Sequence, residues 1–256
     1  MNEHRKDLAR QATNLVGIIA GIALNAIVPR IGEDVGSVSR RVEPMLSAAG
    51  WAFSIWGVIF LWTLAFGIWQ ALPAQRDNAV LRRIGVLPAV NAIGGGLWVL
   101  AFTNEQFVVA VAVMLGILAS LVAIEVRSLG GTGATRWLVR APYGLNLGWI
   151  CVATCLNVAQ TLHHFGYNGA PLSPLFWSMA VVIVAGIIGI AVVWRDDQRW
   201  TGAAVAWGLL GVASEKRGEV DTLALCALVV AVVVLVSMIA SVGRRFAIKV
   251  PRPAHS

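Results

Sequence analysis

The chain has 256 residues, of which 58% are hydrophobic and only 13% are charged. Soluble domains carry about 25% charged residues, so this composition excludes the soluble class and predicts a membrane protein. The net charge of +7 indicates the lipid bilayer rather than nucleic acid as the partner, because the basic residues stand at the ends of apolar runs, where they meet lipid headgroups.

Apolar runs of about 20 residues recur along the chain, and each can cross a hydrocarbon core of about 30 Å as a helix. We therefore predict an all-α fold, a polytopic transmembrane bundle of about eight helices. Arg5, Lys6 and Arg10 precede the first run as in a signal peptide, but no small-x-small cleavage site follows it, so we predict a retained helix. The predicted spans are residues 13–29, 48–72, 84–103, 106–126, 137–162, 174–194, 199–214 and 220–242.

The distribution of Lys and Arg predicts the orientation. With eight spans, 15 of the 20 basic residues fall on the side of the two termini. Cytoplasmic loops hold the basic excess, so we predict a bacterial inner-membrane protein with cytoplasmic termini, residues 1–12 and 246–256. The short seventh run, 199–214, stays in the prediction because without it the basic tail would lie outside.

Segment 30–47 is the long external loop of this topology. Two interpretations stay open for it, a cover for a pocket mouth or a solvated connector. Its charged residues are Arg30, Glu33, Asp34, Arg40, Arg41 and Glu43.

Ionisable groups inside a bilayer usually mark proton or ion paths. Here Glu105, Glu125, His163 and His164 lie at span ends, which disfavours a proton-coupled pump. The two histidines, beside Tyr167, could ligate haem iron, but an interfacial pair is the commoner arrangement. The spacing supplies no metal cluster and no nucleophile–base pair, so we expect neither a metal site nor catalytic residues.

Polarity within the spans comes from asparagines, which either bridge helices or hold the polar edge of a ligand. Asn157 begins a polar stripe at the outer end of the fifth span, continued by Gln160, Thr161 and His164 at helical spacing. We expect this stripe to face neighbouring helices or a cavity. The intramembrane asparagines are Asn14, Asn25, Asn91, Asn146 and Asn157.

The chain contains 11 tryptophans, which fall into two groups. Those near span ends are typical of interfacial anchors: Trp69, Trp137, Trp177, Trp194 and Trp200. The others lie deeper or near the outer mouth: Trp51, Trp56, Trp62, Trp98, Trp149 and Trp207. The second group favours either aromatic walls for a flat apolar ligand or bulky helix packing.

The fifth span carries the most specific motif. Trp149, Ala153, Thr154, Leu156 and Asn157 have the spacing W-x-x-x-A-T-x-L-N, and a proline–tyrosine pair precedes them.

Two other spans carry related aromatic motifs. In the second span, Trp51 and Phe53 form W-x-F, and Phe60 lies four positions after Trp56. In the third span, Trp98 and Phe102 form W-x-x-x-F.

With these motifs the chain resembles the tryptophan-rich sensory protein, or translocator protein, family (TspO/MBR). The resemblance implies a five-helix unit over 13–162, to which 163–245 adds three transmembrane helices. It also implies homodimers through glycine-rich faces and a pocket for planar hydrophobic ligands, such as porphyrin or haem. The ligand-binding residues it implies are Trp51, Phe53, Trp56, Phe60, Asn91, Trp98, Phe102, Trp149, Ala153 and Asn157. Asn91 takes part because Gly95 stands where the family has asparagine.

We therefore predict an integral membrane protein that binds a planar apolar small molecule as a sensor or translocator. Porphyrin or haem is expected as its ligand, with no other cofactor and no enzymatic activity. A small-solute transporter is the alternative, and oxidative porphyrin degradation, which would need photochemistry at tryptophan, is a third and weaker hypothesis.

Overall fold

The computed structural model describes residues 3–42, 45–167, 170–196 and 198–249, and within these ranges it contains helices and no strand. The α-helices are α1 (Glu3–Ile31), α2 (Val35–Val42), α3 (Ile55–Ala71), α4 (Ala79–Ile84), α5 (Leu87–Thr103), α6 (Phe107–Ser128), α7 (Ala141–His164), α8 (Pro174–Asp196), α9 (Arg199–Lys216) and α10 (Asp221–Lys249). Short 3-10 helices η1 (Gly50–Ser54) and η2 (Pro73–Gln75) flank α3, and a π-helical turn, η3 (Arg136–Arg140), precedes α7.

Eight of these helices are long, and each coincides with one predicted span, so the predicted all-α membrane bundle is confirmed. By length and composition, six are sufficient to cross a membrane: α1, η1 with α3, α6, η3 with α7, α8 and α10. The apolar helix α5 has 17 residues and is slightly shorter than this standard. Helix α9 is rich in small residues and lies against α7, α8 and α10, so protein covers much of its surface.

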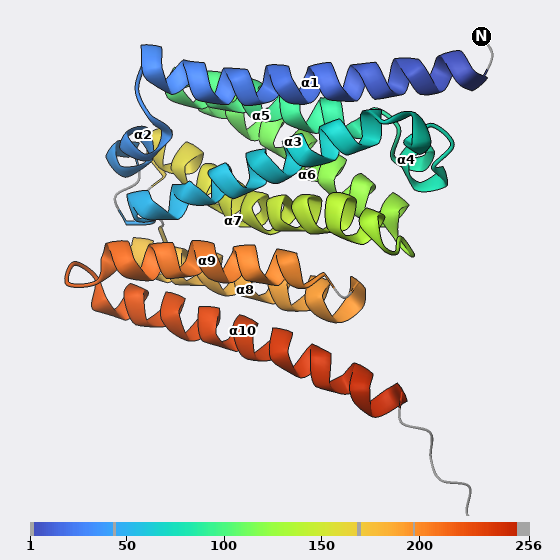
Figure 1. The fold of residues 1–256 in the computed structure, drawn as a ribbon. Coiled ribbons are helices and arrows are strands. Elements are labelled where there is room, and N and C mark those ends of the chain that lie inside the picture. Colours follow the sequence, from blue (N-terminus) through green and yellow to red (C-terminus); the bar gives the residue numbers. More distant parts are fainter. Residues whose placement is uncertain (1–2, 43–44, 168–169, 197, 250–256) are drawn as a thin grey trace, which may run out of the picture.

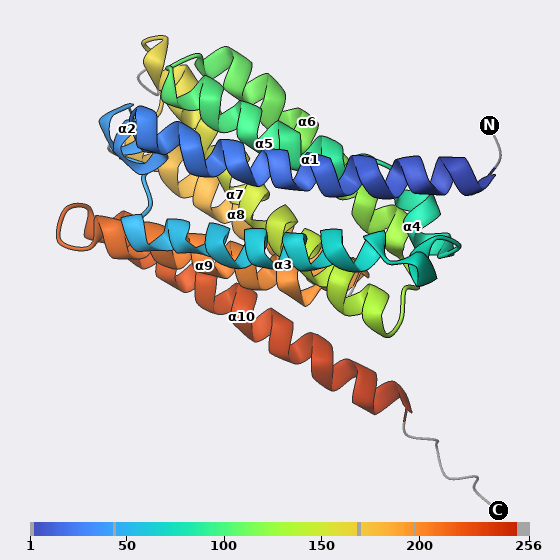
Figure 2. The same ribbon diagram turned by 45° about the horizontal axis from the view of Figure 1, so that its top comes forward.

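The long helices form two groups. Helices α1, α3, α5, α6 and α7 form one group, and α8, α9 and α10 lie beside it as a separate layer (Figures 1 and 2). The groups meet chiefly where α9 packs along α7. One end of the bundle, the α2 end, carries α2, η1 and the turn between α9 and α10, whereas α4 and the start of α1 lie at the other, the basic end (Figure 1).

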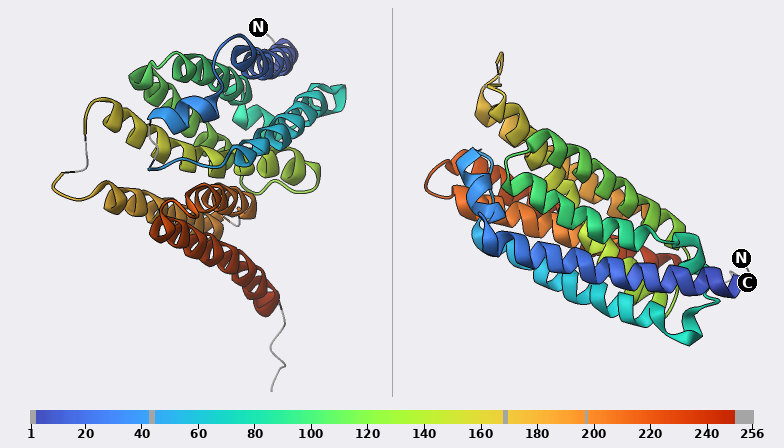
Figure 3. Two further views of the ribbon diagram at one scale, coloured as in Figure 1. Left: turned by 90° about the vertical axis from the view of Figure 1, so that its left-hand side faces the viewer. Right: turned by 90° about the horizontal axis from the view of Figure 1, so that it is seen from above.

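Glycines explain how closely the helices of the first group approach. A Cβ atom on Gly17 would lie 2.5 Å from the Cβ of Ala89, and one on Gly21 would lie 2.2 Å from the carbonyl oxygen of Ala92. Only glycine permits these contacts, which hold α1 against α5 (Figure 3). The predicted homodimer through glycine-rich faces stays a prediction, and this face of α1 is already used within the chain.

The junction of α7 and α9 also depends on glycine. A Cβ on Gly148 would lie 2.2 Å from the carbonyl oxygen of Thr201. The Thr201 hydroxyl donates a hydrogen bond to the Gly144 carbonyl oxygen at 2.9 Å, and Gln198 donates to the Arg140 carbonyl oxygen at 3.0 Å. These contacts attach the second helix group directly to the helix that carries the W-x-x-x-A-T-x-L-N motif.

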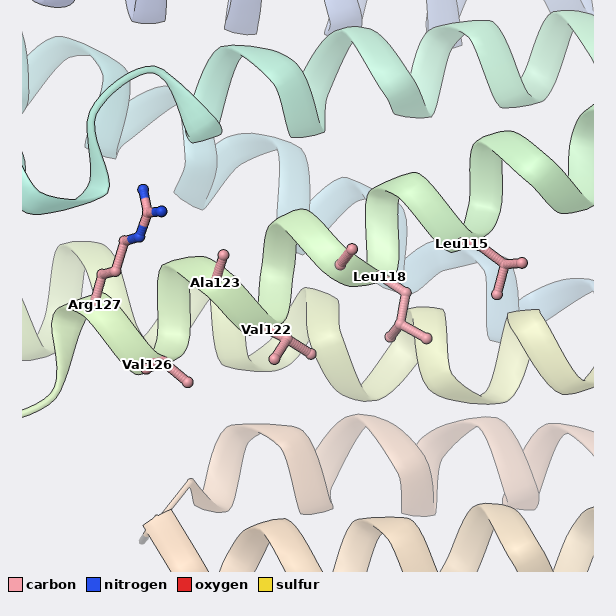
Figure 4. A pocket seen from close by; sticks show the side chains of 7 residues that line it. Leu115, Leu118, Val122, Ala123, Val126 and Arg127 are labelled. Atoms are coloured by element: carbon pink, nitrogen blue, oxygen red, sulfur yellow. The ribbon is translucent and has the colours of Figure 1, made fainter.

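The outer side of α6 is an apolar surface. A shallow groove runs along it, lined by Leu115, Leu118, Ala119, Val122, Ala123, Val126 and Arg127 (Figure 4). Leu115, Val122 and Val126 are exposed, as expected for side chains that meet lipid tails. The groove therefore belongs to the lipid-facing surface of the bundle.

Candidate ligand-binding site

A cavity of about 40 Å³ lies near the α2 end of the bundle, and we call it the aromatic cavity. Helices α2, α3, α5, α7 and α9 and the segment around η1 all contribute to its wall. Its lining residues are Val35, Ser39, Ala48, Phe53, Trp56, Trp98, Phe102, Trp149, Val152, Ala153, Leu156, Asn157, Gln160 and Gly208.

Aromatic rings on four helical elements, η1, α3, α5 and α7, surround this space. The ring of Trp149 is met edge-on by Phe53 and Trp56, with centroid distances of 5.8 and 6.1 Å. Trp98 stacks on Phe102 with centroids 5.0 Å apart and an interplanar angle of 23°. Both geometries are favourable for aromatic pairs. The cavity is therefore bounded by flat apolar surfaces whose positions are fixed by their neighbours.

One polar group in this wall lacks a partner. The indole N–H of Trp98 donates a hydrogen bond to Oδ1 of Asn157 at 3.0 Å, which leaves Nδ2 of Asn157 as the remaining donor. Asn157 is 2% exposed, and its Nδ2 has no hydrogen-bond partner within the described part of the chain. The wall thus presents a buried donor, a complement for an oxygen acceptor.

A second cavity, of about 30 Å³, lies deeper in the bundle, and we call it the amide cavity. Asn146 donates to Oδ1 of Asn91 at 3.1 Å, and Asn91 donates to the Ser120 hydroxyl at 3.1 Å. Oδ1 of Asn146 has no partner among the described residues. Trp56 lines both cavities. The lining residues are Gly21, Ile22, Asn25, Trp56, Ile59, Phe60, Thr63, Asn91, Ala92, Gly95, Ile117, Asn146 and Ile150.

Helix α2 covers the outer side of the aromatic cavity. Val35 and Ser39 of this helix line the cavity, and Gln160 of α7 donates a hydrogen bond to the Ser39 hydroxyl at 2.5 Å. Segment 30–47 therefore matches the first of its two interpretations, a cover for a pocket mouth. Glu43 lies outside the described residues.

Charged contacts at the surface hold the segment around α2. Arg41 pairs with Glu33 at 2.6 Å and with Glu105 in the turn between α5 and α6. Asp34 stands just before α2 and accepts a hydrogen bond from the Ser37 amide at 3.0 Å, as an N-cap does. The Ser37 hydroxyl also donates to Asp34 and lowers the pKa of its carboxyl group below the usual value of 3.8.

The family comparison extends across most of the chain. The model of the TSPO-like protein family matches residues 11–240. The chain belongs to this family. The comparison confirms the resemblance to the TspO family, and the matched range also includes α8 and α9 and most of α10. Comparisons with curated proteins and with solved structures find no match. The division of the chain at residue 162 stays a prediction.

In this TSPO-like protein, most of the predicted ligand-binding residues meet at the two cavities. The aromatic cavity brings together Phe53, Trp56, Trp98, Phe102, Trp149, Ala153 and Asn157. Phe60 and Asn91 line the amide cavity instead, where Asn91 bridges α6 and α7. Trp51 lines neither cavity, because its ring lies edge-on against Trp207 and its N–H donates to Ser214 at 3.3 Å.

Several lining residues were not among those predicted. Gln160 had a signal, because it belongs to the polar stripe of the fifth span. Ser39, Ala48 and Gly208 had none, because each is a small residue in a segment that no motif marks. Gly208 belongs to α9 and reaches the cavity only through the docking of α9 on α7.

Other candidate chemical groups lie elsewhere. The described residues contain no group of three or more His, Cys, Asp or Glu side chains arranged to hold a metal ion. His164 contacts the ring of Phe107 edge-on, with centroids 4.8 Å apart, at the α2 end. Cys151 and Cys155 are unpaired thiols on α7. The aromatic cavity is thus the part of this TSPO-like protein best suited to a small molecule.

Proposed function

We propose that this membrane protein binds a planar apolar molecule of the porphyrin class in the aromatic cavity, as a sensor or translocator without covalent chemistry of its own. The observation that carries the proposal is the unpartnered Nδ2 of Asn157, set among indole and phenyl rings. A buried donor without a partner costs about 1–3 kcal/mol. A carbonyl or carboxylate oxygen on a bound ligand recovers that energy, while the rings contact its flat surface.

The size of the cavity implies that binding requires opening. Pockets for drug-sized ligands measure about 300–1,000 Å³, whereas the aromatic cavity measures about 40 Å³. Helix α2 is the element best placed to move, because it has eight residues and, among the described residues, one side-chain hydrogen bond, Gln160–Ser39, joins it to α7. Its ion pairs through Arg41 are exposed and screened by solvent, so they hold the helix only weakly. We propose that the ligand enters beneath α2.

We further propose that the basic end faces the cytoplasm of a bacterial cell and that the α2 end faces outward. The excess of Lys and Arg in the loops at the basic end supports this orientation. The ligand would then be taken up from the outer side of the membrane.

The direct test is a titration of the purified protein with protoporphyrin IX, followed by intrinsic tryptophan fluorescence. Saturable quenching is expected. Trp149→Ala removes the ring that Phe53 and Trp56 both contact, and it should weaken binding about tenfold, or about 1.4 kcal/mol. Trp137→Ala is the matched control, because Trp137 is exposed and lines neither cavity.

Quenching that does not saturate would contradict the proposal. So would a Trp149→Ala variant that binds as tightly as the Trp137→Ala control.

A second candidate function is transport of a small solute. The observation that favours it is that the two cavities share Trp56 in their walls and that amide side chains line both. Neighbouring cavities of this kind provide successive polar sites within an otherwise apolar bundle. Gradient-driven uptake into proteoliposomes that Trp56→Ala alters would establish this function, and binding without flux would exclude it.

A further inference from the structure

The glycines of α9 have different roles. A Cβ on Gly202 would lie 2.7 Å from Cγ2 of Val193, and one on Gly211 would lie 2.6 Å from the Cβ of Ala52. At both positions an added Cβ would force a neighbouring side chain to move. The three atoms nearest to a Cβ on Gly208 all belong to the side chain of Val152, at 3.2–3.5 Å. Val152 would have to move by only a few tenths of an ångström, so packing constrains position 208 less than positions 202 and 211.

Gly208 is also the α9 residue that lines the aromatic cavity. It shares this wall with Val152 and with Trp149 of α7. Because Gly208 has no side chain, the backbone of α9 forms this part of the wall, and a larger residue would lie beside Val152 at the cavity.

Hydrogen bonds hold α9 in this position. The Trp207 indole N–H donates to the Ala52 carbonyl oxygen at 2.8 Å, and the Ala49 amide donates to the Gly211 carbonyl oxygen at 3.0 Å. The same short segment supplies Ala48 and Phe53 to the cavity. Helix α9 is thus fixed to the cavity wall on both sides of Gly208.

We propose that Gly208 is a ligand-contacting residue that sets the size of molecule the aromatic cavity accepts, and that α9 is a wall of the binding site. The three helices α8–α10 are then part of the site rather than an accessory. This inference rests on the proposed ligand-binding function. The ligand class it implies is a broad planar ring system, whose edge lies against the bare backbone of α9.

The test compares glycine substitutions in two helices. Gly208→Ala and Gly208→Leu are titrated with protoporphyrin IX and with acridine, a smaller planar probe. Gly116→Leu in α6 is the matched control, because a Cβ there meets no atom within 4 Å. Gly208→Leu should weaken porphyrin binding at least about tenfold, or about 1.4 kcal/mol, because the larger side chain overpacks the cavity wall. Acridine binding should change less, and the control should match the wild type.

A labelling experiment covers the case in which Gly208→Leu does not fold. Gly208→Cys is placed in a chain whose three native cysteines, Cys151, Cys155 and Cys226, are replaced by alanine. The parent chain without native cysteines must bind porphyrin as the wild type does. Protoporphyrin IX should slow the reaction of this thiol with a membrane-permeant maleimide, whereas a cysteine at position 116 should react at an unchanged rate.

The outcomes separate the two proposals. If the wild type binds neither probe saturably, the proposed function fails and this inference fails with it. If the wild type binds porphyrin but the Gly208 variants bind it like the control and the thiol at position 208 is not protected, the role of Gly208 alone is overturned. Equal weakening for both probes would also overturn the size-selective role.

Discussion

The aromatic cavity and the amide cavity share Trp56 as a wall, yet their polar groups have opposite character. The aromatic cavity presents a free donor, Nδ2 of Asn157, whereas the amide cavity presents a free acceptor, Oδ1 of Asn146. Asn146 continues a hydrogen-bond chain that joins α7 to α5 and α6, while Asn157 bonds to one indole. Both amides join α7 to neighbouring helices, so burial alone does not show whether an amide is also available to a ligand.

The largest expected effect comes from removing the ring of Trp56, which lines both cavities. Trp56 stacks on Phe60 with centroids 5.2 Å apart and contacts Trp149 edge-on. Trp56→Ala should therefore join the two spaces and lower the free energy of unfolding by about 3 kcal/mol. Thermal unfolding in detergent measures this loss. Trp137→Ala, at an exposed position, should cost much less, and equal losses would mean that Trp56 does not support both walls.

Substitutions of the two amides, Asn157 and Asn146, should have smaller effects, which differ in ligand affinity but not in stability. Asn157→Leu removes one unpaired donor but leaves the Trp98 N–H without its acceptor, and Asn146→Leu removes one unpaired acceptor but leaves Oδ1 of Asn91 without its donor. Each variant exchanges one unsatisfied group for another, so both should unfold within about 1 kcal/mol of the wild type.

Their affinities for protoporphyrin IX should differ. Asn157→Leu should bind about fivefold more weakly, because one hydrogen bond of about 1 kcal/mol is lost, and Asn146→Leu should be unchanged. Fluorescence titration of both variants makes the comparison. If Asn146→Leu weakens porphyrin binding as much as Asn157→Leu does, the ligand occupies both cavities, and the aromatic cavity is not the separate binding site.

The smallest expected effect concerns the cover of the aromatic cavity. The pKa of Asp34 is lower in the folded chain than the unfolded value of 3.8. Its carboxylate therefore stabilises α2 at pH values above 3.8, and this stabilisation is lost as the pH falls through the folded pKa. Asp34→Ala should cost α2 about 1 kcal/mol at neutral pH, as expected for loss of an N-cap.

Hydrogen-exchange protection of the α2 amides measures the effect of Asp34. Protection should decrease in the variant and, in the wild type, as the pH is lowered below about 4. The backbone amides of the residues that line the amide cavity should keep their protection, because α2 does not line that cavity. Unchanged protection of α2 in the variant would show that Asp34 does not cap this helix.

Helix geometry explains why several residues of the tryptophan pattern lie at one cavity. Trp149, Ala153 and Asn157 lie four residues apart on one helix, so they share a face and meet the same cavity. Trp98 joins them because its N–H needs an acceptor in an apolar interior, and Asn157 provides it. Trp51 was predicted by the same pattern but lies outside both cavities. Its N–H donates a hydrogen bond to Ser214 of α9, and its ring packs edge-on against Trp207.

The sequence by itself determined the membrane class and the eight helices, because a long apolar segment in a bilayer must satisfy its backbone hydrogen bonds within itself. Only the tertiary structure decided that α9 forms a wall of the aromatic cavity and that Trp56 lines both cavities. Trp207 reaches Ala52 of η1 across 155 residues of chain, and close packing at Gly148 and Gly211 brings α9 there. No local spacing encodes such a contact, because it depends on which helix faces are bare enough to meet.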